Sequence, residues 1–82
     1  MQMAGMTNSN AAGGAIVDID ARGLKCPWPA LRLARMMRAE KCVVIVADDP
    51  IAPTEISSLA GEKGWTVEEI RTPLGAGWRI FR

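Results

Sequence analysis

The alternation of apolar and polar stretches along the chain predicts four short strands and two helices. The strands are expected at residues 15–20, 42–47, 65–71 and 78–82, and the helices at residues 29–40 and 53–63. Residues 42–47 form a continuous apolar run with several β-branched side chains, which is typical of a central strand buried on both faces. Residues 1–14 lack any periodicity and are rich in Gly, Ala, Asn and Ser, so we expect a flexible tail before one folded domain at residues 15–82.

The order of these elements, βαβαββ, indicates an α/β fold of the two-layer α+β sandwich type. Each helix follows a strand, and a strand–helix–strand unit favours parallel pairing of its strands. The Pro- and Gly-containing turn expected at residues 72–77 favours an antiparallel hairpin at the end of the chain. We therefore expect a four-stranded mixed sheet with both helices packed on one face, and the last strand as a candidate exposed edge.

The first helix is expected to be amphipathic. At about 100° per residue, one arc is apolar and should face the sheet. This arc contains Ala30, Leu33, Ala34, Met36 and Met37. The opposite arc carries Arg32, Arg35 and Arg38, with the apolar Leu31 among them. This basic stripe is either an ordinary solvated face or a docking surface for an acidic partner or for RNA phosphates, and Leu31 favours docking.

The composition narrows the functional classes. The 82 residues include ten basic and nine acidic side chains, and this net charge of +1 argues against direct nucleic-acid binding. Histidine is absent, which excludes a Cys–His nucleophile pair, a Ser–His–Asp triad and histidine metal ligation, and we expect neither a cofactor nor a metal site. No signal peptide and no membrane span is evident, so we expect a cytoplasmic protein that does not engage a membrane.

Cys26 has the features of a reactive thiol. It lies just ahead of the first helix, whose N-terminal N–H groups and dipole favour an anion. Arg22 and Lys25 flank it, Arg32 is expected within range, and all three should stabilise a thiolate. The alternative, a structural cysteine that packs on the core, is disfavoured by this basic and proline-rich surrounding.

Two prolines frame the segment that follows the cysteine. Pro27 and Pro29 restrict the backbone, and the preference of a residue before proline for extended geometry should hold Cys26 outward. Pro29 falls near the first helical position, where its missing N–H costs little. Trp28 stands between the prolines, either packed against the helix or a strand, or exposed as an anchor for a partner.

Cys42 opens the apolar run at residues 42–47, and we interpret it as a small core residue. The alternative is a resolving thiol that forms a redox switch with Cys26, which requires Cα atoms within about 7 Å. Since no histidine is present, no general base is evident beside Cys26. A complete hydrolase is therefore disfavoured, and group carriage or redox exchange remains.

Residues 20–29 read D-A-R-G-L-K-C-P-W-P, which resembles the D-x-x-G-L-x-C-P-x-P segment of the TusA/SirA-like sulfur-carrier family. The motif includes Gly23 and places Cys26 at the family's cysteine. A second stretch, A-D-D-P at residues 47–50 followed by a helix with Glu55, is also similar to the family. The resemblance covers residues 16–82. Within it, Asp48 and Asp49 either orient the cysteine loop or cap the second helix.

The resemblance implies a two-layer sandwich that acts as a sulfurtransferase-type carrier rather than as a complete enzyme. It implies that Cys26 accepts sulfane sulfur as a persulfide from a cysteine desulfurase or a rhodanese-like donor and passes it to an acceptor protein. In the best-known branch of the family this sulfur ends in tRNA thiolation, and other branches serve cofactor biosynthesis or other sulfur trafficking.

The sequence also departs from the family pattern. Trp28 occupies a place where the tRNA-thiolation branch carries an acidic residue, so a different partner is expected. The later helix has Leu59 and Ala60 and no second cysteine. Two other functions remain as alternatives to the carrier: a non-enzymatic regulatory or RNA-binding module that uses the arginine face, and the thiol redox switch.

Overall fold

The computed structural model of the protein describes residues 16–82, so the tail predicted at residues 1–14 lies outside the described residues. The elements are β1 (Ile19–Ala21), α2 (Trp28–Met36), β2 (Cys42–Ala47), α3 (Ala52–Lys63), β3 (Thr66–Thr72) and β4 (Gly75–Phe81). The predicted order βαβαββ is confirmed. β2 has the predicted bounds, whereas β1 is shorter than predicted and begins at Ile19.

The four strands form one mixed sheet in the order β1-β2-β4-β3. β1 pairs with β2 in parallel, and β4 is antiparallel to both β2 and β3. The expectation of an edge position for the last strand is therefore wrong, because β4 lies inside the sheet. Ile80 explains this placement, since it is fully buried and lies opposite Val43 on one side and Val67 on the other.

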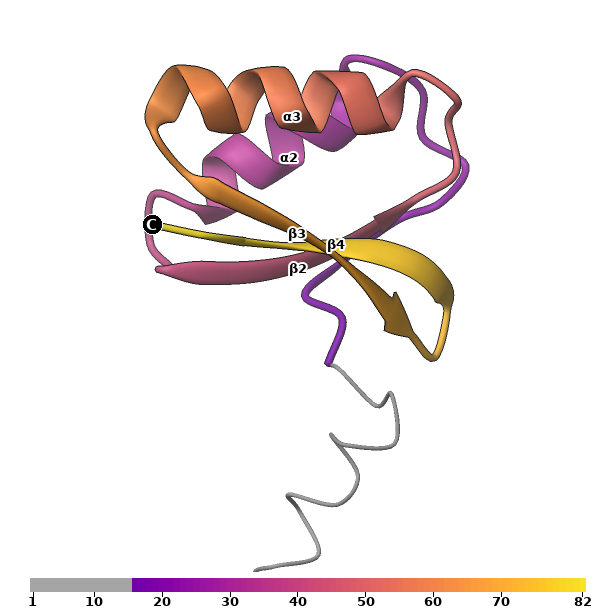
Figure 1. Ribbon diagram of the computed structural model, residues 1–82. Helices are drawn as coiled ribbons and strands as arrows, with labels where there is room; N and C mark the ends of the chain where they lie inside the picture. The colour runs from indigo at the N-terminus through magenta and orange to yellow at the C-terminus, as the bar shows by residue number, and fades with distance from the viewer. Residues whose placement is uncertain (1–15) are drawn as a thin grey trace, which may run out of the picture.

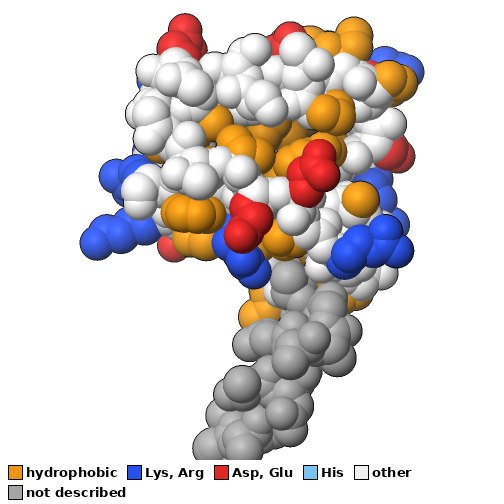
Figure 2. Space-filling view, viewed as in Figure 1, with side chains coloured by type: hydrophobic (Ala, Val, Ile, Leu, Met, Phe, Trp, Pro, Cys, Tyr) orange, Lys and Arg blue, Asp and Glu red, His pale blue; other side chains and the backbone are white. Residues whose placement is uncertain are grey.

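Both helices cover the same face of the sheet, as predicted (Figure 1). The core lies between the two layers, where Leu33 of α2 and Ile56 of α3 meet Ile45 and Ile80 of the sheet, all fully buried. Burial of each such side chain contributes about 1.5–3 kcal/mol. In the same orientation, Figure 2 shows hydrophobic side chains in the hollow between the layers and charged side chains around it.

The helix ends differ slightly from the prediction. α2 ends at Met36, four residues before the predicted end at Glu40, and the chain then turns. α3 begins at Ala52 and ends at Lys63, and its C-cap residue is Gly64, whose φ of 76° is the left-handed conformation that favours glycine. The predicted apolar arc of α2 is confirmed, because its members are buried or half-buried.

The expectation that Cys42 is a core residue is wrong, because its side chain is exposed. Successive strand residues point to opposite faces of a sheet. Since Val43 points into the helix-covered core, Cys42 points to the opposite face, at the very start of β2 and opposite Phe81 of β4. The buried part of the apolar run therefore begins at Val43.

Candidate functional site

The loop between β1 and α2 carries Cys26 and is held against the segment that follows β2. The N–H of Gly23 donates to Asp48 Oδ1 at 2.9 Å, and the N–H of Cys26 donates to Asp49 Oδ2 at 2.6 Å. β1 and β2 are parallel, so their carboxyl ends meet at the same edge of the sheet and bring the loop to the two aspartates. Gly23 has a φ of 83°, a conformation that side-chain-bearing residues rarely adopt.

These contacts decide between the two roles left open for the aspartates. No side chain caps the N-terminus of α3, whose N-cap residue is Ile51. The hydrogen bond from the Ile51 N–H to Asp49 Oδ1 is long, at 3.4 Å. The hydrogen bond from the Cys26 N–H to Asp49 Oδ2 is much shorter, at 2.6 Å. The two aspartates therefore orient the cysteine loop. A hydrogen bond to a charged acceptor contributes about 1.5–3 kcal/mol, and less where it is exposed.

The position of Cys26 directly ahead of α2 is confirmed. Its side chain is half-buried, Pro27 is the N-cap residue, and α2 begins at Trp28. Pro29 is fully buried as the second helical residue, so it fixes the start of the helix on the core. The peptide bond between Cys26 and Pro27 is cis.

The expected electrostatic environment of Cys26 is wrong in sign. Burial raises the pKa of the Cys26 thiol, and the negative charge of Glu55, a hydrogen bond to the Glu55 side chain and the charge of Asp49 raise it further. Arg22 is engaged elsewhere, because its guanidinium forms an ion pair with Asp20 at 2.8 Å. Lys25 is exposed on the loop. These contributions favour the thiol over the thiolate at Cys26.

Glu55 is the functional candidate that the sequence did not reveal as a neighbour of Cys26. It lies in the first turn of α3 and is half-buried. The sequence placed it in a helix after the two aspartates. Its approach to Cys26 depends on how α3 packs against the rest of the chain, which no local pattern encodes.

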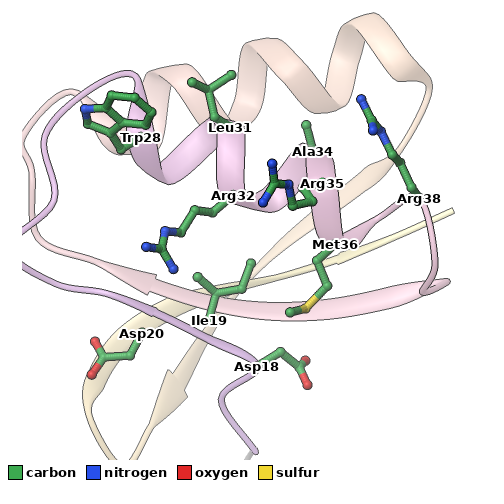
Figure 3. A pocket seen from close by; sticks show the side chains of 10 residues that line it. All are labelled: Asp18, Ile19, Asp20, Trp28, Leu31, Arg32, Ala34, Arg35, Met36 and Arg38. Carbon is green, nitrogen blue, oxygen red and sulfur yellow. The ribbon is translucent and has the colours of Figure 1, made fainter.

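A groove of about 690 Å³ runs between α2 and the edge strand β1, next to the cysteine loop (Figure 3). Its lining residues are Asp18, Ile19, Asp20, Trp28, Leu31, Arg32, Ala34, Arg35, Met36 and Arg38. Trp28 is 57% exposed and Leu31 is 51% exposed, so neither is covered by the described part of the chain. This exposure favours the interpretation of Trp28 as an anchor rather than as a packing residue.

The two walls of this groove carry opposite charges, with arginines on the α2 side and aspartates on the β1 side. Within residues 16–82, Arg32 and Arg35 of α2 and Arg38 in the turn after it make no ion pair. The acidic groups of the β1 wall are already engaged, since Asp18 Oδ2 accepts the Val44 N–H at 2.8 Å and Asp20 pairs with Arg22. The groove therefore offers uncompensated positive charge beside exposed apolar side chains.

The two cysteines lie at opposite ends of β2. Cys26 is bonded to Asp49, just beyond the end of the strand, whereas Cys42 is its first residue. The five residue steps from Cys42 to Ala47 span roughly 16 Å, far beyond the ~7 Å limit for the Cα atoms of a disulfide. An intramolecular redox switch between these cysteines is therefore incompatible with this fold.

Over residues 16–82, no three His, Cys, Asp or Glu side chains are grouped so that they could hold a metal ion. No helix in that range is both long enough and apolar enough to cross a membrane.

Comparison with known proteins identifies a family and a similar solved structure. The family model described as sulfurtransferase TusA matches residues 17–81. The crystal structure of a SirA-like protein from Desulfitobacterium hafniense is similar with a TM-score of 0.65 and 23% sequence identity, covering 80% of this chain and 95% of that chain. At this identity the likeness concerns the fold. No curated protein matches the chain.

Proposed function

The chain belongs to the sulfurtransferase TusA family, and from this premise we propose that it carries sulfane sulfur as a persulfide on Cys26. The sulfur comes from a cysteine desulfurase or a rhodanese-like donor and passes to an acceptor protein. The observation that carries the proposal is the placement of Cys26, a half-buried thiol fixed at the start of α2 by the 2.6 Å bond to Asp49. The relay is proposed to operate in the cytoplasm.

The chemistry needs no cofactor. The sulfur of Cys26 attacks the terminal sulfur of the donor's persulfide, the donor's S–S bond breaks, and the donor's cysteine leaves with the electron pair and takes up a proton. The sulfane sulfur moves without net oxidation or reduction. Delivery to an acceptor thiol is the same displacement with the carrier as donor. One accessible thiol and one docking surface are sufficient for both steps.

The groove beside Cys26 supports a protein partner with an acidic surface. Arg32 and Arg35 supply the charge, while Trp28 and Leu31 supply exposed apolar anchors. The alternative of an RNA-binding module is disfavoured by the net charge of only +1 over the 82 residues. Partner choice on this surface decides which branch of sulfur trafficking the chain serves, whether tRNA thiolation or cofactor biosynthesis.

Incubation with a cysteine desulfurase and L-cysteine tests the proposal. An intact-mass measurement should show a gain of about 32 Da that a reductant removes. The gain should be lost in Cys26→Ser and kept in Cys42→Ser, a matched control because Cys42 is an exposed free thiol away from the site. Loading that persists in Cys26→Ser would contradict the proposal.

A further inference from the structure

The strand β3 (Thr66–Thr72) forms one edge of the sheet, and β1 forms the other. All residues of β3 except Thr72 are exposed or half-buried. A long exposed edge strand offers a row of backbone N–H and C=O groups to which another strand can bond, so natural proteins either protect such an edge or pair it. The residues of β3 decide between these two cases.

The backbone groups of β3 that face outward follow from the pairing inside the sheet. The N–H of Val44 donates to Asp18 Oδ2, and its C=O accepts the Asp18 N–H, so both groups face β1. Since this direction alternates along a strand, the groups of Ile45 face its partner Trp78 on β4. The same alternation, followed from Trp78 across to β3, leaves three residues whose groups face outward: Val67, Glu69 and Arg71. Within residues 16–82 these groups have no hydrogen-bond partner.

Two of these residues carry opposite charges. Glu69 and Arg71 are exposed and lie on the helix-covered face of the sheet, because Glu69 lies opposite Trp78, which packs against the core. In the described part of the chain, neither Glu69 nor Arg71 belongs to an ion pair. Ile70 lies between them, half-buried, and points to the other face.

This arrangement of charge selects one register for pairing with a second β3. In a contact with two-fold symmetry the central residue lies opposite its own copy. A centre at Glu68, Glu69 or Arg71 would place like charges against each other, and a centre nearer either end would leave most of the strand unpaired. A centre at Ile70 places each Glu69 opposite the Arg71 of the other copy, and each such pair exchanges both of its N–H···O=C bonds.

We propose that β3 pairs with the β3 of a second copy of this chain, antiparallel and centred on Ile70. The two four-stranded sheets then join into one continuous sheet. Cys26 follows β1, the opposite edge strand, so the two cysteine sites lie at the far ends of the joined sheet and stay open to sulfur donors and acceptors. The pairing is independent of the sulfur relay.

Charge reversal tests the contact between Glu69 and Arg71. In Glu69→Arg and in Arg71→Glu, like charges face each other in both pairs, so dimerisation measured by sedimentation equilibrium under reducing conditions should weaken about tenfold or more. An equimolar mixture of the two variants should dimerise again, because every facing pair then has opposite charges. Glu62→Arg is the matched control for net charge, since Glu62 is exposed on α3 rather than on β3, and it should dimerise like the parent protein.

A cross-link at position 70 tests the register. At the centre of the contact the two Cα atoms are about 4.5 Å apart, which suits a disulfide. With Cys26 and Cys42 both replaced by Ser, Ile70→Cys should give a linked dimer on mild oxidation, and Thr66→Cys, on the same strand and face, should not. A parent protein that stays monomeric at every concentration, charge variants that dimerise as it does, or equal cross-linking at both positions would overturn the inference and leave the sulfur relay untouched.

Discussion

Replacement of Asp49 by alanine should loosen the loop that presents Cys26. The change removes the 2.6 Å bond from the Cys26 N–H to Asp49 Oδ2 and leaves that partly buried N–H without its charged acceptor. Such a bond contributes about 1.5–3 kcal/mol, so the free energy of unfolding should fall by about 2 kcal/mol. For a domain of this size, this corresponds to a decrease in Tm of roughly 10 °C.

Asp48→Ala provides the comparison. It removes the bond from the Gly23 N–H, which is longer, at 2.9 Å, and exposed to solvent. Water can replace an exposed acceptor, so the loss should be about 0.5–1 kcal/mol. Each variant loses one carboxylate that holds the same loop. The difference between their free energies of unfolding therefore measures how much more the partly buried bond to Cys26 contributes than the exposed bond to Gly23.

Thermal unfolding followed by circular dichroism measures both variants. Amide hydrogen exchange of Cys26 and its alkylation rate with iodoacetamide then report on the loop itself. Asp49→Ala should increase both rates, because it exposes the amide and removes a charge that raises the pKa of the thiol. If Asp49→Ala is no less stable than Asp48→Ala and leaves amide exchange at Cys26 unchanged, the loop is not held by Asp49 as described.

Two further predictions concern charge. Because the pKa of Cys26 is raised in the folded protein, the unfolded chain loses its thiol proton first as the pH rises. The thiol's contribution to stability is therefore present below its ordinary pKa of about 8.5 and is lost at higher pH. The difference in free energy of unfolding between the parent protein and Cys26→Ser, measured with urea, should therefore change with pH only above about 8.5. Charge reversal at Arg32 and Arg35 should raise the KM for loading by an acidic desulfurase several-fold at low salt and leave loading by glutathione persulfide unchanged. Equal loss with both donors would place these arginines outside the docking surface.

Local patterns were sufficient to predict most of the fold. The apolar run of β2, the proline at the start of α2 and the glycine after α3 each specify an element from its own residues. The interior position of β4 could not be predicted in this way, because it follows from pairing with both β2 and β3 at once. Cys42 is exposed at the start of β2 although Val44 and Val46, which point to the same face, are buried, and how far this face is covered along the strand is also a non-local property.

The sequence predicts where the site lies, but not the electrostatic environment of its thiol. The sequence places Cys26 ahead of a helix and beside basic residues, and the structure confirms the position. The basic neighbours do not act on the thiol as expected, because Arg22 pairs with Asp20, and burial and the negative charges of Glu55 and Asp49 raise the pKa of the thiol. Contacts between groups from different elements set the charge at the thiol, and the order of residues in the loop does not specify them.

Site-resolved mass spectrometry after loading tests the central claim most directly. The protein is incubated with a cysteine desulfurase and L-cysteine, blocked with iodoacetamide, digested, and analysed for peptides that contain Cys26 or Cys42. The account predicts one added sulfur, about 32 Da, on the Cys26 peptide, none on the Cys42 peptide, and loss of the added sulfur when an acceptor thiol is supplied before blocking. Sulfur found on Cys42 alone, or on neither peptide, would contradict it.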